Sequence, residues 1–277
     1  MLSSHRMKLL AVLVALAALG CAARVASAAN RDVTPSISSN WAGYAISDPM
    51  TIAGATPTAP LAFSDVTATF VQPTATCGTS GAAYSAFWVG LGGFATNATT
   101  LEQVGTESDC TDTGEPTYFA WYEIVPAPSM RVNLKIHPGD TITTAVLVNG
   151  TSVLVEVKDR TRGVSFTKRL TVANPDVSSA EWIAEAPSEC QTRCQVLPLA
   201  NFGTVAFSKI AAVANGHPGT LTDPAWASLP IQLVPHASFH SFFGGPDDAS
   251  KAGATPGSSS TDGRTFTVSW LADAVAQ

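Results

Sequence analysis

Four polar residues stand out because they lie inside runs that are otherwise apolar or aromatic. They are Gln103 in LEQVG, Glu123 in AWYEIVP, and Glu181 and Glu185 in AEWIAE. A carboxylate in such a run either faces solvent or is buried, and a buried one needs hydrogen-bond donors if it is to stay ionised. A carboxylate can take a proton from water, and a glutamine amide can donate to a developing oxyanion. The pattern therefore indicates a hydrolytic site, with plain solvent-facing strand positions as the alternative.

Glu181 and Glu185 are four residues apart, so secondary structure decides whether they can cooperate. In a helix they would lie about 6 Å apart on one face. In a strand they would share a face with residue 183 but lie roughly 13 Å apart along the backbone. Turn-prone NPDVSS precedes this segment and Pro187 follows it, which favours a strand. We therefore expect that the two glutamates do not act as a pair.

Other familiar catalytic constellations are missing from the sequence. His137, His217, His236 and His240 have no companions at metal-binding spacing, and there is no G-x-S-x-G elbow and no Walker loop. A serine triad assembled from distant residues is left open, although nothing points to one. We expect no metal and no cofactor.

The first 28 residues have the pattern of a secretory signal peptide. Basic Arg6 and Lys8 precede an apolar run at 9–23, and small residues follow at 26–28. The run is too short for a confident membrane span. We therefore expect an exported protein without stable membrane association, whose mature chain is residues 29–277.

Charge narrows the range of partners. Residues 1–28 contain three basic and no acidic side chains, so the formal charge changes from −6 to 12 − 21 = −9 when they are removed. An anionic chain of this kind is a poor ligand for nucleic acid or for an anionic membrane. We expect a monomer that binds neither nucleic acid nor a membrane.

The mature chain has four cysteines, at positions 77, 110, 190 and 194. An even number in an exported chain favours two disulfides over metal ligation or a free nucleophile. The short spacing between Cys190 and Cys194 suggests a local bridge, which leaves Cys77 to pair with Cys110.

Short β-like segments dominate the mature chain. Segments rich in β-branched and aromatic residues recur between turn-forming residues, at 66–71, 84–91, 118–125, 141–148, 153–157, 164–170, 204–210 and 265–271. Asn149-Gly150 is a strong hairpin signal, and 208–215 is the only plausible short helix. The pattern predicts one all-β domain of antiparallel sheets packed as a sandwich. We expect the Gly- and Ser-rich segment 245–264 to be a flexible loop, either a tolerated insertion or a flap over a cleft.

Six sequence blocks, in the same order, resemble the eqolisin family of glutamic endopeptidases. They are SSNWAGYAI at 38–46, AFWVGLGG at 86–93, LEQVGTES at 101–108, YFAWYEIVP at 118–126, PGDTI at 138–142 and AEWIAE at 180–185. The resemblance implies a jelly-roll or concanavalin-like sandwich of two curved antiparallel sheets, with a cleft on a concave face. It also implies a catalytic glutamine and glutamate, which fall on Gln103 and Glu185. Glu181 would then be accessory or structural.

The resemblance suggests roles for further residues. Trp41 and Trp88 lie in matching blocks and would either wall the cleft or belong to the core, and Glu123 would support the site. Gly92 and Phe119 stand where many fungal relatives have aspartates, so the surroundings of the dyad differ.

Together with the signal-peptide pattern, the resemblance therefore implies a secreted endopeptidase that acts on polypeptides in acid. Glu185, ionised in the resting enzyme, would be the base and then the acid, and Gln103 would stabilise the oxyanion. One alternative is a jelly-roll glycoside hydrolase that uses Glu123 and Glu185 as acid and nucleophile. Another is a carbohydrate-binding module with tryptophans that stack on sugars. Neither alternative needs Gln103.

Overall fold

The computed structural model describes residues 35–49, 60–78, 81–95, 98–190, 194–235 and 251–274. Within these ranges the chain is built from strands and turns, and no helix is long and apolar enough to cross a membrane. The expected signal peptide at 1–28, His236, His240 and residues 245–250 lie outside the described ranges. The described residues belong to one compact unit, Val33–Gln277.

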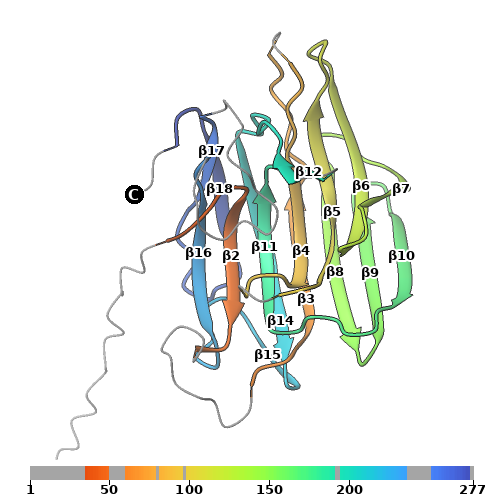
Figure 1. Cartoon of the computed structure of the whole chain (residues 1–277), viewed down its shortest axis with the longest axis vertical. Helices are drawn as coiled ribbons and strands as arrows, with labels where there is room; N and C mark the ends of the chain where they lie inside the picture. The colour runs from red at the N-terminus through yellow and green to blue at the C-terminus, as the bar shows by residue number, and fades with distance from the viewer. Residues whose placement is uncertain are drawn as a thin grey trace, which may run out of the picture. The chain divides into compact units, whose positions relative to one another are not determined.

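Eighteen strands make up the described part of the fold (Figure 1). Their bounds are β1 Ser36–Ser38, β2 Trp41–Ser47, β3 Phe63–Val71, β4 Ala86–Gly92, β5 Leu101–Cys110, β6 Pro116–Val125, β7 Met130–Lys135, β8 Thr141–Asn149, β9 Ser152–Asp159, β10 Val164–Thr171, β11 Ser179–Glu185, β12 Ser188–Cys190, β13 Cys194–Val196, β14 Thr204–Ala214, β15 His217–Gly219, β16 Ala227–Leu233, β17 Gly253–Pro256 and β18 Phe266–Leu271.

Most strands belong to one long antiparallel path that folds back on itself. The order is β10-β9-β8-β3-β14-β18-β17-β16-β2-β11-β4-β5-β6-β7, with β15 beside β14 and β1 parallel to β16. Strands β4, β5 and β11 contact β3, β8 and β9 across the fold, so the two halves of the path form two layers. Figure 1 shows β2, β11, β4 and β5 running side by side in front of β3, β8 and β14. The predicted β-sandwich is confirmed.

Alternation along β11 assigns its side chains to opposite faces of the sheet. Trp182 and its two alternate neighbours point into the core between the layers, where Phe70, Phe87 and Phe207 also lie. Ile183 points to the other face and packs in a smaller apolar cluster with Trp41 and Trp88. Residues 181 and 185 share that outer face because the side-chain period of a strand is two. The predicted strand is confirmed.

Two local predictions have different outcomes. The hairpin is confirmed, because Asn149 pairs with Ser152 across a two-residue turn in which Gly150 has φ 58°. The helix at 208–215 is wrong, because β14 runs through most of that segment. Lys209 has φ 51° and the register with β3 shifts there, so a bulge separates buried Phe207 and Ile210 by three positions. A bulge thus imitates helical spacing in the sequence.

The segment 245–264 is only partly loop-like. Its described part contains β17, which pairs with β18, so a loop is the wrong prediction for Gly253–Pro256. Backbone pairing needs no large side chain, which is why a Gly- and Ala-rich strand was missed. The next turn is closed by the Ser260 hydroxyl, which accepts hydrogen bonds from the backbone N–H groups of Arg264 and Thr265.

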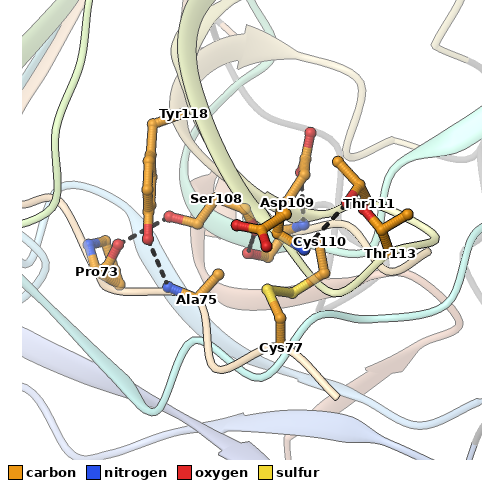
Figure 2. Close-up of a disulfide and its surroundings, with 11 residues drawn as sticks. Pro73, Ala75, Cys77, Ser108, Asp109, Cys110, Thr111, Thr113 and Tyr118 are labelled. Carbon is orange, nitrogen blue, oxygen red and sulfur yellow. Dashed lines mark hydrogen bonds between the residues drawn. A yellow bond between two sulfur atoms is a disulfide. The ribbon is translucent and has the colours of Figure 1, made fainter. Parts of the chain in front are cut away.

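Both predicted disulfides are present. Cys77–Cys110 ties the end of β5 to the segment after β3, and Cys190–Cys194 joins β12 to β13. Figure 2 shows Tyr118 close to the first bridge, where its hydroxyl accepts the N–H of Ala75 at 3.2 Å. The first bridge therefore fixes one end of β5, the strand that carries Gln103.

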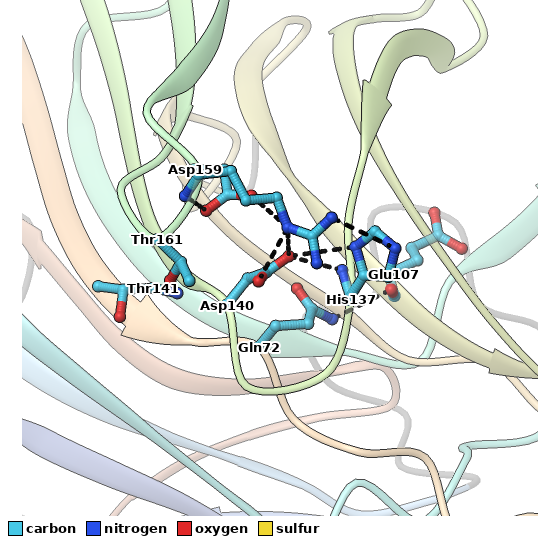
Figure 3. A network of polar contacts seen from close by, with 8 residues as sticks. Gln72, Glu107, His137, Asp140, Thr141, Asp159 and Thr161 are labelled. Carbon is cyan, nitrogen blue, oxygen red and sulfur yellow. Dashed lines mark hydrogen bonds and ion pairs between the residues drawn. The ribbon is translucent and has the colours of Figure 1, made fainter.

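A polar network also reaches β5, through Gln72 in the segment after β3 (Figure 3). The Arg162 guanidinium lies 3.3 Å from carboxylate oxygens of both Asp140 and Asp159. Gln72 lies beside this group, and its amide donates to the backbone carbonyl of Glu107 at 3.1 Å. The network joins the ends of β8 and β9 to the middle of β5.

Gly105 in β5 provides a stability test. A Cβ at this position would overlap the Phe87 carbonyl oxygen and lie 2.6 Å from the Cβ of Trp88. We expect Gly105→Ala to destabilise the fold by about 1–3 kcal/mol, the usual cost of overpacking, measured by denaturant unfolding. Gly78→Ala is the control, because a Cβ there has no neighbour within 4 Å. Equal stability of the two variants would contradict this packing.

Candidate active site

The candidate catalytic residues lie on the outer face of four adjacent strands. The register of β11, β4, β5 and β6 aligns them in cross-strand rows. The rows are Glu181, Gly90, Gln103 and Glu123; then Ile183, Trp88, Gly105 and Trp121; then Glu185, Ala86, Glu107 and Phe119. Gln103 and Glu185 therefore share one face, two strands and two rows apart.

A cleft of about 500 Å³ opens over this face. Both Gln103 and Glu185 line it, together with Trp41 and Trp121. Residues 125–129 line it as well, and so does the segment 187–190 that leads into the Cys190–Cys194 bridge. The structure thus brings the predicted glutamine and glutamate into one cleft, although they are 82 positions apart in the sequence.

Glu185 is held by a hydrogen-bond donor at each carboxylate oxygen. Asn40 donates from Nδ2 to Oε1 at 2.9 Å, and Trp88 donates from Nε1 to Oε2 at 2.7 Å. Burial, followed by the negative charge of Glu123, raises the pKa of Glu185 to about 8, against the lowering effect of bonds from Trp88, Trp41 and Asn40. Burial and these donors act on the ionised form in opposite directions, so the expectation that Glu185 is ionised in the resting enzyme stays a prediction.

Gln103 is oriented by a carboxyl group. Its Nε2 donates to Oε2 of Glu123 at 2.6 Å, whereas its Oε1 has no hydrogen-bond partner among the described residues. Burial raises the pKa of Glu123 to about 7, and the bond from Gln103 opposes that rise. The second hydrogen of Nε2 and both lone pairs of Oε1 are left for other groups.

The two tryptophans of the matching blocks have different positions. Trp88 is fully buried and packs edge to face with Trp41, with ring centroids 5.0 Å apart and planes at 78°. Trp41 lines the cleft directly. Trp88 combines a core position with a polar role, since its indole N–H reaches Glu185.

Sequence reasoning missed a second pair of carboxyl groups beside the dyad. Glu107 lines the cleft, and its carboxyl is hydrogen-bonded to that of Asp109. Burial raises the pKa values of both groups, that of Asp109 to about 6, and the charge of Arg131 opposes the rise at Asp109. The signal was available, because residues 103, 107 and 109 fall on one face of a strand. Asn40, in the quoted block SSNWAG, was missed too.

Glu181 lies on the same face but away from Glu185. It is fully buried, and neither of its carboxylate oxygens has a hydrogen-bond partner in the described part of the chain. Burial raises its pKa, and the nearby charges of Asp176 and Glu102 add to the rise. Glu102 is likewise fully buried, and burial raises its pKa to about 8. Glu102 and Glu181 lie near the ends of β5 and β11 that are farther from Glu185.

No three His, Cys, Asp or Glu side chains in the described ranges are arranged to hold a metal ion. His137 lies beside Asp140, and His217 lies 2.9 Å from Asp223, both with exposed side chains. The cleft offers carboxyl groups, the side-chain amides of Asn40 and Gln103, serine hydroxyls and indole N–H groups.

Comparisons with known proteins agree with this geometry. The family model described as the Peptidase A4 family matches residues 39–232. Scytalidoglutamic peptidase with a peptide-based transition-state analogue is 25% identical with a TM-score of 0.62, over 84% of this chain and 98% of that chain. Aspergilloglutamic peptidase from Aspergillus niger is 25% identical with a TM-score of 0.51, over 68% of this chain and 99% of that chain.

A third structure matches at the level of the fold. SCP-B, a member of the eqolisin family in complex with the tripeptide Ala-Ile-His, is 24% identical with a TM-score of 0.59. It covers 84% of this chain and 98% of that chain. Among curated protein sequences, none matches.

The buried carboxyl groups of Glu102 and Glu181 predict that stability depends on pH. Both pKa values are raised above the ordinary value of 4.5, that of Glu102 to about 8. Stability is therefore full below 4.5 and is lost as pH rises through the raised values. We expect Glu102→Gln to reduce this loss by a few kcal/mol, measured by unfolding at pH 4 and pH 8. Glu115→Gln, at an exposed position, is the matched control. Parallel pH curves for both variants and the wild type would contradict the prediction.

Proposed function

The chain belongs to the Peptidase A4 family and is a glutamic endopeptidase, and from this premise we propose that Gln103 and Glu185 form its catalytic dyad. The observation that carries the proposal is that both side chains line one cleft on the same face of the sheet. Peptide hydrolysis without a nucleophilic side chain requires a base for water and a donor for the oxyanion. The cleft contains one candidate for each task.

Glu185 acts on the water and then on the leaving group. In its ionised form the carboxylate takes a proton from water, whose oxygen bonds to the scissile carbonyl carbon. The protonated carboxyl then gives this proton to the amine nitrogen as the C–N bond breaks. The donors Asn40 and Trp88 each occupy one lone pair of a carboxylate oxygen and leave further lone pairs for the water.

Gln103 acts through hydrogen bonds alone. One Nε2 hydrogen is given to Glu123, which fixes the plane of the amide, and the second is free to donate to the oxyanion. The unpartnered Oε1 accepts a hydrogen from the attacking water. Glu123 therefore supports the site by orienting Gln103. This role distinguishes the proposal from a glycosidase, in which Glu123 would have to be the acid, and the comparisons do not favour that alternative.

We place the working range on the weakly acidic side of neutrality. The base needs a deprotonated Glu185, whose raised pKa reduces activity as pH falls. Glu102 and Glu181 reduce stability as pH rises above 4.5. Activity is therefore lost at low pH and stability is lost at high pH, so an intermediate pH range is favoured.

We also propose a secreted monomer that acts on polypeptides. The two disulfides are typical of oxidising compartments outside the cytosol. The sequence pattern at 1–28 and the mature charge of −9 support export and argue against nucleic acid as a partner.

Two variants test the dyad. We expect Gln103→Ala and Glu185→Gln each to lower kcat for a denatured protein substrate by at least about 100-fold, the usual effect of removing a base or an oxyanion donor. Both should keep the β-sheet circular dichroism of the wild type. Glu115→Gln is the control for general loss of a carboxylate, and it should keep full activity. Substantial turnover by Glu185→Gln would reject Glu185 as the base.

The pH dependence of kcat/KM tests the state of the base. Because the pKa of Glu185 is raised from 4.5 to about 8, the acid limb of the profile should lie above 4.5. The measurement is initial-rate hydrolysis of a fluorogenic peptide in buffers from pH 3 to pH 8, with short assays so that unfolding does not contribute. An acid limb below 4.5 would show that Glu185 titrates like an exposed glutamate.

A further inference from the structure

The corner between β1 and β2 lies directly against Glu185. Ser38 ends β1, Asn40 precedes β2, and both side chains are 1% exposed. The sequence distance from Asn40 to Glu185 is 145 positions, and the pairing of β2 with β11 brings them together. The mechanism above uses the Asn40 amide only as a donor, so the reason that it points its N–H groups at Glu185 still needs an explanation.

Ser38 determines which way the amide faces. The Ser38 hydroxyl donates to Oδ1 of Asn40 at 3.2 Å. The same oxygen of Ser38 accepts the backbone N–H of Asn40 at 3.3 Å and that of Trp41 at 3.1 Å. Its single hydrogen and both lone pairs are therefore occupied. Because Oδ1 is the atom that receives the hydroxyl hydrogen, Nδ2 must face Glu185.

The backbone keeps this corner in place. The carbonyl of Asn40 accepts the N–H of Ala186 at 2.9 Å, and the carbonyl of Ser38 accepts the N–H of Val234 at 2.9 Å. Asn40 thus holds residue 185 through its side chain and residue 186 through its main chain. The main-chain bond fixes the backbone of Asn40 beside Glu185, and the Ser38 hydroxyl fixes the orientation of its side-chain amide.

We infer that Asn40 is a positioning residue, which Ser38 orients so that it holds the Glu185 carboxylate in its ionised form and in a fixed plane. The inference rests on the proposed role of Glu185 as the base. A primary amide is suited to this task because its N–H donates whatever the pH, whereas a carboxyl or imidazole would gain or lose a proton. The charges of Glu123 and Glu107 disfavour ionisation of Glu185, and Glu189 lines the same cleft.

Fixed donors favour the ionised form of Glu185 against the negative charges of these neighbouring carboxyls. Trp88 and Asn40 each supply one, to different oxygens, and a hydrogen bond from Trp41 acts in the same direction. Loss of a hydrogen bond to a charged group disfavours the ionised form relative to the protonated form. Removing the Asn40 amide should therefore raise the pH at which Glu185 ionises and becomes active as a base. This shift is separate from any change in the maximal rate.

The test is the pH profile of kcat/KM for Asn40→Ala and Ser38→Ala. We expect Asn40→Ala to shift the acid limb upward by about one pH unit, the size expected for loss of one charge-assisted hydrogen bond. Ser38→Ala keeps the donor but frees the amide to turn, so its shift should have the same sign and be smaller. Asn201→Ala is the control. The side-chain oxygen of Asn201 also accepts a local hydrogen bond, from the N–H of Gly203, but Asn201 does not line the cleft.

A purely structural role for Asn40 would lower the melting temperature and reduce kcat/KM equally at every pH. An acid limb that stays at the wild-type position in both variants would overturn the inference. If Asn40→Ala does not fold, the shift in Ser38→Ala decides the matter. Carboxyl titration by ¹³C NMR of glutamate-labelled protein provides a readout that needs no activity, and it should show the resonance lost in Glu185→Gln titrating at higher pH in Asn40→Ala.

The same experiment separates the two proposals. If Glu185→Gln remains active, the proposed dyad fails. If Glu185→Gln is inactive and Asn40→Ala has an unshifted limb and an unshifted titration, the dyad stands and the positioning role fails.

Discussion

The fold must keep several carboxyl groups out of water, and no salt bridge within the described residues involves Glu102, Glu181 or Glu185. Glu102 and Glu181 are fully buried, and Glu185 lies at the base of a cleft with other glutamates for neighbours. Burial without a counter-charge favours the protonated form of each. Glu185 accepts hydrogen bonds from two neutral donors, Asn40 and Trp88. These bonds favour its ionised form and so oppose the effect of burial.

The architecture supplies these donors from separate parts of the chain. Trp88 comes from β4 and Asn40 from the start of β2, and both strands flank β11 in the sheet. Gln103 comes from β5, which the Cys77–Cys110 bridge and the network around Arg162 support (Figures 2 and 3). Polar groups from adjacent, hydrogen-bonded strands therefore meet on the outer face of the sheet. Rigid support of this kind favours catalysis by fixed dipoles, which need no rearrangement during the reaction.

Local patterns predicted much of this arrangement, and long-range register accounts for the rest. The strand at AEWIAE follows from period-two alternation and flanking turns, and the disulfides follow from the number of cysteines. The bulge at Lys209 was mistaken for helical spacing, and β17 was missed because glycine and alanine carry no strand signal. The hydrogen bond between Asn40 and Glu185 depends on which strands are neighbours, and no local pattern shows that. The raised pKa of Glu185 depends on burial, which one sequence does not display.

The central claim is that Gln103 and Glu185 act together on one tetrahedral centre. A crystal structure of the mature protein with a phosphinate peptide, whose phosphorus imitates that centre, tests it most directly. The account predicts one phosphinate oxygen within about 2.7–3.1 Å of Gln103 Nε2 and the other within hydrogen-bond distance of the Glu185 carboxyl. A phosphinate bound in the cleft with either residue out of contact would contradict the account.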